Sequence, residues 1–233
     1  PREISYRIDS IEFNFIDKIL RKLHTPSVNN SLTTLKEAGF AFDHAVYNVE
    51  NDSYLIGFFQ SEKYFQDIRN ELLKEFVLTC PLDDTNQKIK NNILKSNSVA
   101  IHIRRGDYVN HDLHGISLLK YYNNAIDYIL KNVKEPEVFF FSDDIAWVKE
   151  NIKIDCKCFY VTNNPPEKGY LDLELMKYCK HFVIANSSFS WWGAWLSTNP
   201  DKIVIAPQTW FSTPSTGDMD IKDLIPPSWI KMS

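Results

Sequence analysis

The chain has 233 residues, with 26 Lys and Arg against 30 Asp and Glu, which gives a formal net charge of −4. Nucleic acids and anionic membrane surfaces require concentrated positive charge, so this balance predicts neither as a partner. No apolar run approaches the ~20 residues of a membrane span, and no basic-then-apolar leader opens the chain. We therefore expect a soluble cytoplasmic protein of one large or two small domains, peripheral to the inner membrane if its source is bacterial.

The first part of the chain carries amphipathic patterns and one aromatic-rich run. Apolar residues at helical spacing predict helices over three stretches: Asp17–Leu23, Ser61–Phe76 and Lys88–Lys95. The aromatic-rich run Tyr54–Phe59 predicts a short strand. This part is predicted to be an N-terminal domain over residues 1–90.

After Ser96, short buried apolar runs alternate with helical patterns. Strands are predicted at Val99–Ile103, Val138–Phe141, Phe159–Val161, Phe182–Ala185 and Ile203–Ala206. Helices are predicted at Leu118–Lys131, Ile145–Asn151, Leu171–Cys179 and Ser190–Ser197. The alternation is typical of a doubly wound α/β domain, predicted here over residues 91–233. Such sheets bind ligands at the carboxyl ends of their strands, so chemistry is expected in the residues that follow each strand.

Two adjacent arginines, Arg104 and Arg105, directly follow the first strand of this series, and His102 and Asp107 flank them. A guanidinium group matches phosphate oxygens in a bidentate way, so the pair predicts a diphosphate site. A structural ion pair with Asp107 or with Asp143 is the alternative, and the residues alone leave it open.

The second strand ends in Ser142, Asp143 and Asp144. Ser142 or Asp143 is expected to cap the helix that starts at Ile145. An acid that is not used as a cap could accept paired hydrogen bonds from the N1–H and amino groups of guanine. Base recognition at this strand end is therefore an open hypothesis.

The strand ending at Ala185 is followed by Asn186, Ser187 and Ser188 and then by a tryptophan-rich segment. Backbone N–H groups and hydroxyls at a helix start favour an anion, so this turn is a candidate phosphate seat. A simple N-cap followed by a buried helix is the alternative. We expect both features together, with a functional turn and tryptophans that belong mostly to the core.

Several familiar signatures are missing. The seven glycines form neither G-x-G-x-x-G nor a Walker A loop, which argues against nicotinamide dehydrogenases and ATPases. The four cysteines lack metal-ligand spacing and are expected to be reduced. The remaining formal metal motifs are predicted to be solvated loops without a metal: Asp218-Met-Asp220 and His111-Asp112-Leu-His114.

Three motifs occur in order: His102-Ile-Arg-Arg-Gly-Asp-Tyr108, the strand end Phe141-Ser-Asp-Asp144, and Leu171–His181 running into Asn186-Ser-Ser-Phe-Ser-Trp-Trp-Gly-Ala-Trp-Leu196. Together they resemble glycosyltransferase family 11, the α-1,2-fucosyltransferases. The similarity extends to Tyr54–Phe65 and to Lys202–Trp210, so it covers most of the chain.

The resemblance implies a GT-B-like α/β fold, in which two Rossmann-like parallel-sheet domains face a cleft. It also implies GDP-fucose as the donor, inverting transfer without a metal or other cofactor, and the 2-hydroxyl of a terminal galactose in an oligosaccharide as the acceptor. The family's Gly-rich N-terminal unit, resembling G-G-L-G-N-Q, has no match before Tyr6. The N-terminal, acceptor-side domain is therefore expected to be incomplete.

The resemblance also implies roles for individual residues. Arg104 and Arg105 would hold the diphosphate, and Asp143 would read guanine. The seat would be completed by three residues of one turn: Asn186, Ser187 and Ser188. His102 and Asp107 match motif positions in the same site.

Breaking the bond between fucose and phosphate builds negative charge on GDP, which fixed guanidinium groups stabilise. Arg104 and Arg105 are therefore expected to be catalytic as well as binding residues. Asp107 is the first candidate for the base that accepts the proton of the acceptor, with Asp112 and Asp172 behind it. An orienting role for Asp107 is also open, because an arginine lies close to it in sequence.

Two alternatives remain. The tryptophans could belong to a non-catalytic carbohydrate-binding protein, which would need Trp191, Trp192 or Trp195 in solvent. The chain could also be a transferase that uses a different nucleotide-sugar donor. The acceptor glycan and the oligomeric state cannot be inferred from these residues.

Overall fold

Buried apolar runs form a six-stranded parallel sheet in the computed structural model, which describes residues 33–50, 53–106, 119–211 and 220–233. Its strands in chain order are β3 (Asn97–Ile103), β4 (Pro136–Ser142), β5 (Cys158–Val161), β6 (His181–Val183), β7 (Val204–Pro207) and β8 (Ile230–Met232). Every neighbouring pair is parallel. The predicted α/β class is therefore confirmed.

The strand order is β5-β4-β3-β6-β7-β8. From β3 the chain moves outward to β4 and β5, then returns to β6 on the other side of β3 and continues to β7 and β8. This is the order of a dinucleotide-binding Rossmann sheet, and its direction reverses between β3 and β6. A crevice forms at the carboxyl ends of the two strands that flank such a reversal, so the fold itself marks where a ligand binds.

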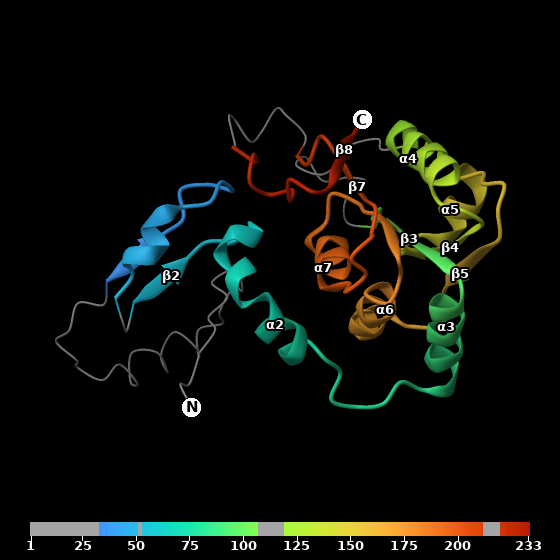
Figure 1. Ribbon diagram of the computed structural model, residues 1–233, viewed down its shortest axis with the longest axis horizontal. Coiled ribbons are helices and arrows are strands. Elements are labelled where there is room, and N and C mark those ends of the chain that lie inside the picture. Colours follow the sequence, from blue (N-terminus) through green and yellow to red (C-terminus); the bar gives the residue numbers. More distant parts are fainter. Residues whose placement is uncertain (1–32, 51–52, 107–118, 212–219) are drawn as a thin grey trace, which may run out of the picture.

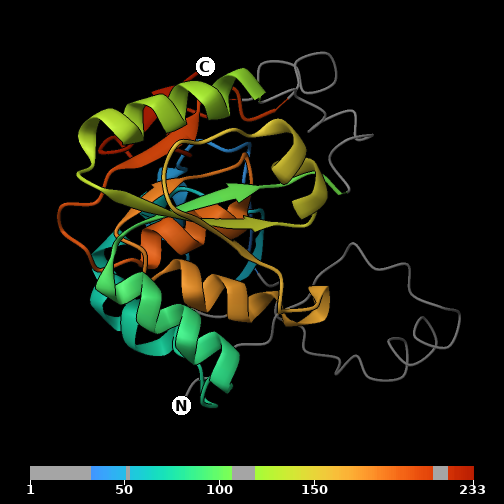
Figure 2. The ribbon, with the colours of Figure 1, turned by 90° about the vertical axis from the view of Figure 1, so that its right-hand side faces the viewer.

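Helices cover both faces of this sheet because alternate strand residues point to opposite sides. Val99, Ile101 and Ile103 of β3 pack in one cluster with the helices α4 (Leu119–Asn132) and α5 (Ile145–Asn151). Ala100 belongs to the opposite cluster, with α3 (Asp84–Lys95), α6 (Gly169–Met176) and α7 (Ser188–Leu196). Figure 2 shows the resulting three layers, with α4 above the sheet and α3, α6 and α7 below it.

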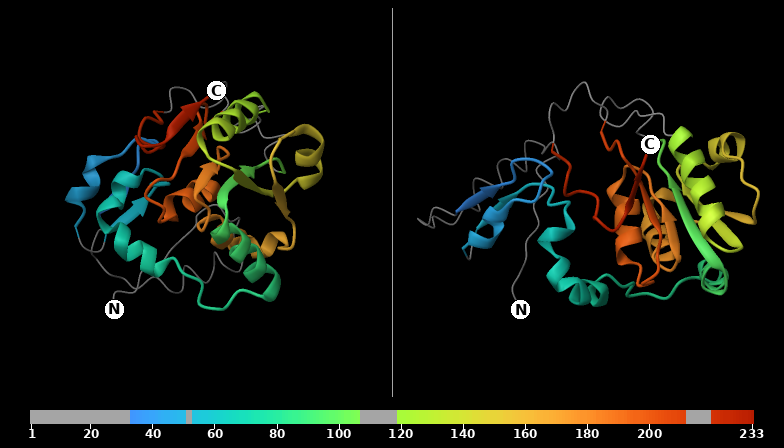
Figure 3. Two further views of the ribbon diagram at one scale, coloured as in Figure 1. Left: turned by 45° about the vertical axis from the view of Figure 1, so that its right-hand side comes forward. Right: turned by 45° about the horizontal axis from the view of Figure 1, so that its top comes forward.

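A second, two-stranded parallel sheet lies in the N-terminal part and pairs β1 (Thr34–Lys36) with β2 (Tyr54–Ile56). Short helices accompany it: η1 (His44–Asn48), η2 (Glu62–Tyr64), η3 (Gln66–Ile68) and α2 (Arg69–Glu75). Another short helix, η4 (Pro166–Lys168), connects β5 to α6. Figures 1 and 3 show that β1 and β2 stand apart from the large sheet, with α2 between them and α7.

The N-terminal part packs on α7 through aromatic and charged side chains. The Phe65 ring stacks on Trp192 with a centroid distance of 5.1 Å, and the Arg69 guanidinium lies 4.3 Å from the centroid of the Trp195 ring. Arg69 also donates to the carbonyl oxygens of Trp195 (2.6 Å) and Ser197 (3.0 Å) at the end of α7, and the Lys202 ammonium group donates to the same two oxygens. This contact therefore joins the two parts and caps α7 at once.

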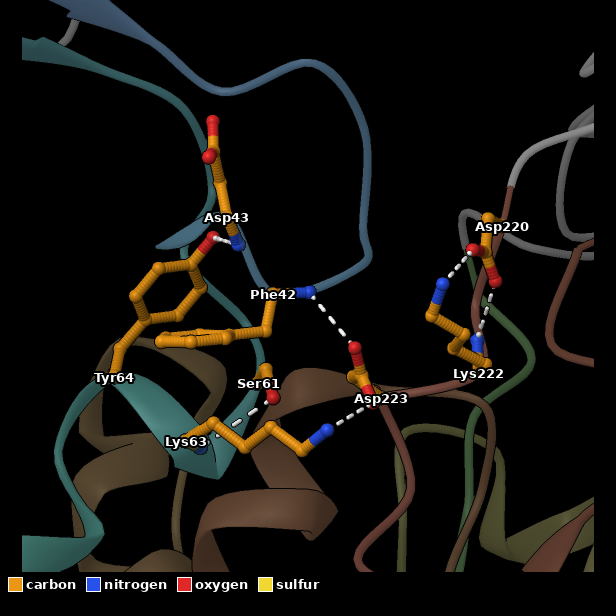
Figure 4. Close-up of polar contacts among 8 residues, drawn as sticks. All are labelled: Phe42, Asp43, Ser61, Lys63, Tyr64, Asp220, Lys222 and Asp223. Carbon is orange, nitrogen blue, oxygen red and sulfur yellow. Dashed lines mark hydrogen bonds and ion pairs between the residues drawn. The ribbon is translucent and has the colours of Figure 1, made fainter. Parts of the chain in front are cut away.

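A second junction is centred on Asp223, in the segment that precedes β8. Its carboxylate accepts hydrogen bonds from the backbone N–H of Phe42 (3.0 Å) and from the Lys63 ammonium group. Figure 4 shows Asp223 reaching both groups, with the Phe42 ring packed beside Tyr64. The C-terminal segment thus holds the N-terminal part from a second direction.

The predicted strands and helices of the large sheet are confirmed with shifts of a few residues at their ends, and β1 and β8 are additional. The helix predicted over Ser61–Phe76 is wrong in its first half, where the chain forms 3-10 turns and α2 begins only at Arg69. Phe65 leaves helical geometry between those turns (φ −146°, ψ 7°) and stacks on Trp192. The helix predicted at Asp17–Leu23 lies outside the described residues, and the division into domains 1–90 and 91–233 stays a prediction.

Candidate functional site at the strand ends

The sequence-predicted arginines and the Asn-Ser-Ser turn come together at the reversal of strand order. In the ladder between β3 and β6, Ile101 pairs with Val183. The same register places Ile103 level with Ala185, so Arg104 and Asn186 leave the sheet beside each other. A centroid distance of 5.3 Å between the rings of His102 and Phe189 also ties the end of β3 to the start of α7.

The loop that carries the arginines is held by Asp143, at the end of the neighbouring strand β4. The Asp143 carboxylate accepts hydrogen bonds from the backbone N–H of Arg105 (Oδ1, 2.8 Å) and of Gly106 (Oδ2, 3.1 Å). It also forms an ion pair with the Arg104 guanidinium, at 3.2 Å from Nη1 to Oδ2. The structural ion pair considered from the sequence is therefore present, and its geometry fixes where both arginines leave the sheet.

Arg105 is held by a second acid and by an aromatic ring. Its Nε lies 3.2 Å from Asp144 Oδ2, and its guanidinium carbon lies 4.0 Å from the centroid of the Trp147 ring. The same carboxylate caps α5 by accepting the N–H of Trp147 at 3.0 Å. That backbone hydrogen bond, helped by Arg105, lowers the pKa of Asp144 below its usual range.

This arrangement corrects the expectation that Ser142 or Asp143 caps α5. Ser142 accepts the backbone N–H of Asp144 (3.0 Å) and so orients the true cap, while Asp143 faces the arginine loop. Reasoning from sequence missed Trp147 as a partner of Arg105. The sequence signal for Trp147 was its spacing. It lies three residues after the acidic residue Asp144, and a capping carboxylate accepts the backbone N–H at that position.

His102 is the second-last residue of β3, two residues before Arg104, and is only 5% exposed. Its Nδ1 is buried and has no hydrogen-bond partner among the residues that the structure describes. Burial, with a smaller contribution from the nearby Arg104 charge, lowers the pKa of His102 to about 3. The imidazole is therefore neutral at physiological pH and can either donate or accept a single hydrogen bond from Nδ1, depending on its tautomer.

The three residues of the turn before α7 have different surroundings. Asn186 is buried and donates from Nδ2 to the carbonyl oxygen of Trp210 (2.9 Å), so this bond holds the turn against the next strand connection. Ser187 is buried at the N-cap position, where its side chain makes no capping hydrogen bond. Ser188, the first residue of α7, is exposed. The start of α7 is therefore a polar helix N-terminus with an accessible hydroxyl.

Among the described residues, no candidate for the catalytic base lies beside the arginines. Asp107 and Asp112 lie outside them, as do His111, His114 and Asp218. Asp172 lies on α6 and accepts a hydrogen bond from Asn164 (2.7 Å), in a polar cluster away from the arginines, and burial raises its pKa.

Asp220, the second acid of the formal D-x-D motif, pairs with Lys222 at 2.7 Å (Figure 4). Within the ranges that the structure covers, no three His, Cys, Asp or Glu side chains are grouped as metal ligands would be. In the same ranges, no helix is long and apolar enough to cross a membrane.

The tryptophans of α7 mostly belong to the core. Trp191 and Trp195 are each 3% exposed, and Trp192 is half-buried beneath Phe65. The Trp191 indole N–H donates to the carbonyl oxygen of Leu224 (2.9 Å), and that of Trp195 donates to Glu62 (3.0 Å). A carbohydrate-binding surface built on exposed tryptophans of α7 is therefore not what the sequence forms.

Comparison with known proteins identifies the relatives of this chain. The chain is 35% identical to the O-antigen biosynthesis glycosyltransferase WbnK of Escherichia coli, over 70% of this chain and 57% of that protein. It is 35% identical to an α-1,2-colitosyltransferase of E. coli, over 76% of this chain and 61% of that protein. A galactoside 2-α-L-fucosyltransferase of Caenorhabditis elegans is 27% identical over 81% of this chain and 56% of that protein.

The chain thus spans about three fifths of the length of the relatives it matches. The sequence model of glycosyl transferase family 11 matches residues 11–233, which is nearly the whole chain. Together with the arginine loop at the reversal of a Rossmann-ordered sheet, this match shows that the chain belongs to glycosyl transferase family 11.

Proposed function

We propose that the protein transfers fucose from GDP-fucose to the 2-hydroxyl of a terminal galactose in an oligosaccharide, with inversion at the anomeric carbon and without a metal. The observation that carries the proposal is the pair Arg104 and Arg105, held by Asp143 and Asp144 at the reversal of strand order. Membership of glycosyl transferase family 11 supports the reaction class, and the α-1,2 linkage in the names of two relatives' activities supports the position of attack.

The arginine side chains remain accessible although each is paired. Those of Arg104 and Arg105 are 38% and 27% exposed. A guanidinium group has five N–H donors, and the ion pair of Arg105 uses its Nε. Because the loop backbone is fixed by Asp143, these donors are preorganised for phosphate oxygens and need little reordering when a diphosphate binds.

In the proposed reaction the bond between the anomeric carbon and the phosphate oxygen breaks, and its electron pair leaves with GDP. A bond then forms between that carbon and the galactose O2, whose proton passes to a base, for which Asp107 remains our candidate. Arg104 and Arg105 stabilise the negative charge that develops on GDP. Ser187, Ser188 and the N-terminus of α7 add donors, and the neutral His102 ring supports the start of α7 through its contact with Phe189.

Guanine recognition is proposed for Asp143 in addition to its role in the loop. Its two oxygens already accept from Arg105, Gly106 and Arg104. An ionised carboxylate has about four acceptor positions, so one further hydrogen bond from the base fits, in place of the pair considered from the sequence.

A second candidate keeps the same site but uses a different sugar. The 35% identity to an α-1,2-colitosyltransferase favours an activated colitose as the rival donor. The two sugars are distinguished by offering both activated donors, in competition, to one galactose-terminated acceptor and identifying the product.

Titration calorimetry of the 233-residue chain with GDP-fucose, GDP and UDP tests the site directly. GDP and GDP-fucose are expected to bind, UDP more weakly, and a chelator is expected to leave all three affinities unchanged. Transfer to lactose, with the new linkage read by NMR, tests the reaction. Failure of GDP to bind would overturn the proposal.

A further inference from the structure

An aromatic pocket of about 70 Å³, partly open to solvent, lies between the segment 58–65 and the first turns of α7. Its aromatic lining includes Phe58, Phe65, Trp191 and Trp192, and its polar lining residues are Gln60 and Ser188. Binding pockets are typically lined by apolar side chains with a few polar groups that orient the ligand. The arginine loop and the turn residues Asn186 and Ser187 do not line this pocket.

Phe58 differs from a core residue in that most of its side chain is exposed to solvent. Its side chain is 72% exposed, the highest value among the large hydrophobic side chains that the structure describes. One face of its ring stacks on Phe40 at a centroid distance of 5.5 Å. An exposed ring held in one orientation contributes little to the core, so its placement points to a contact with something outside the chain.

The backbone next to Phe58 adopts an energetically unfavourable conformation. Phe59 has φ 47°, in the left-handed region that non-glycine residues rarely adopt. The buried Glu37 carboxylate accepts the N–H groups of both Phe58 (2.8 Å) and Phe59 (2.9 Å) through Oε2. Backbone strain of this kind persists where the surroundings enforce it, and it concentrates at functional sites.

Two further contacts hold Glu37 in place. Its Oε1 accepts the Tyr64 hydroxyl (2.9 Å), and that hydroxyl in turn accepts the backbone N–H of Asp43 (2.9 Å; Figure 4). A Cβ on Gly57 would lie 2.5 Å from the Cβ of Glu37, so only glycine allows this close approach. This network also ends β2 at Ile56, which is why the predicted strand Tyr54–Phe59 is shorter than expected.

The pocket adjoins the proposed donor site. Ser188 lines it and is also the exposed first residue of α7, while the next residue, Phe189, contacts the His102 ring below the arginines. A ligand in the pocket would therefore lie beside the helix N-terminus at which we place the diphosphate.

We propose that this aromatic pocket binds the terminal sugar ring of the acceptor, with Glu37 as the positioning residue of its outer wall. The proposal rests on the proposed function, because the donor site next to the pocket is what makes an acceptor its occupant. The C–H faces of a pyranose ring match aromatic walls, and its hydroxyls match Gln60 and Ser188. An alkyl chain would use the walls but not the polar groups.

The test measures lactose binding to the GDP-loaded chain by saturation-transfer NMR and by the fluorescence of the pocket tryptophans. Phe58→Ala is expected to weaken lactose binding about tenfold, the factor that corresponds to a lost stacking contact of about 1.4 kcal/mol. Tyr47→Ala is the matched control, because Tyr47 is 67% exposed, belongs to the same part of the chain and does not line the pocket. This control is expected to leave lactose affinity unchanged.

GDP affinity, measured on the same samples, separates the two proposals. We expect it to be equal in the wild type, Phe58→Ala and Tyr47→Ala. Lactose binding that is absent from the wild type, or unaffected by Phe58→Ala, would overturn the acceptor pocket while leaving the donor site intact. Binding of octanol but not of lactose would replace the sugar with an apolar occupant and would also overturn it. Absence of GDP binding would instead overturn the proposed function.

Discussion

The Asp143 carboxylate accepts the backbone N–H of Arg105 at 2.8 Å, so the end of β4 sets the conformation of the loop that leaves β3. The adjacent Asp144 pairs with the Arg105 side chain at 3.2 Å. One acid therefore orients the backbone of Arg105 and the next acid orients its guanidinium group. Such preorganisation is what a fixed positive site for a leaving diphosphate requires.

Replacement of Asp143 tests whether it positions the loop alone or also reads the base. Asp143→Ala is expected to weaken the binding of both GDP and UDP, because the N–H groups of Arg105 and Gly106 lose their acceptor. The loss of GDP affinity is expected to be larger than the loss of UDP affinity, because the contact between Asp143 and the guanine base is lost as well. Calorimetry with both nucleotides measures the two losses, and equal losses would restrict Asp143 to positioning.

Gly106→Ala tests the loop without removing a charge. A Cβ at this position would lie 2.9 Å from Asp143 Oδ2, closer than real Cβ atoms approach oxygen. The carboxylate must move away, and the hydrogen bonds to Arg105 and Gly106 lengthen. We expect GDP affinity to fall about tenfold, the effect of losing about one charged hydrogen bond, with little change in thermal stability. Unchanged GDP affinity would show that the loop geometry is not needed for binding.

Arg105→Ala tests the diphosphate contact itself. Loss of a charge-assisted contact is expected to weaken GDP binding by about 10- to 100-fold. The unfolding free energy should fall by only about 1 kcal/mol, since the Asp144 pair is partly exposed and the Trp147 contact is modest. Arg105→Lys keeps the charge without the planar fork and should be intermediate.

Lys157→Ala is the matched control for Arg105→Ala. It removes a cation paired with Glu137 (3.0 Å) at the start of β4, the opposite end of the sheet from the arginines. GDP affinity should be unchanged in this variant. A similar loss in both variants would point to net charge rather than to a phosphate contact.

The large sheet could be predicted from the sequence because its strands are continuous apolar runs buried on both faces, such as Phe139, Phe140 and Phe141 in β4. Parallel pairing then placed Arg104 and Asn186 at one edge. β8 has a half-buried and exposed pattern over only three residues and gives no such signal. The role of Glu37 was equally hidden, since its partners are backbone N–H groups 21 and 22 residues away.

The pH dependence of stability provides the last prediction, because His102 is buried and its Nδ1 is paired with none of the described residues. Its pKa is about 3 in the folded chain, against 6.5 for an unperturbed histidine. Between these values the unfolded chain binds a proton that the folded chain does not, so stability falls as the pH drops below 6.5. At pH 4.5 this difference amounts to about 2 to 3 kcal/mol for a shift of this direction and size.

His102→Phe removes the titration and keeps a planar ring in the same space. We expect its unfolding free energy, from urea denaturation, to decrease less than that of the wild type between pH 7 and pH 4.5. The exposed His44 provides a control variant, His44→Phe, that also lacks one imidazole. A pH profile parallel to that of the wild type would mean that His102 becomes charged within the folded protein.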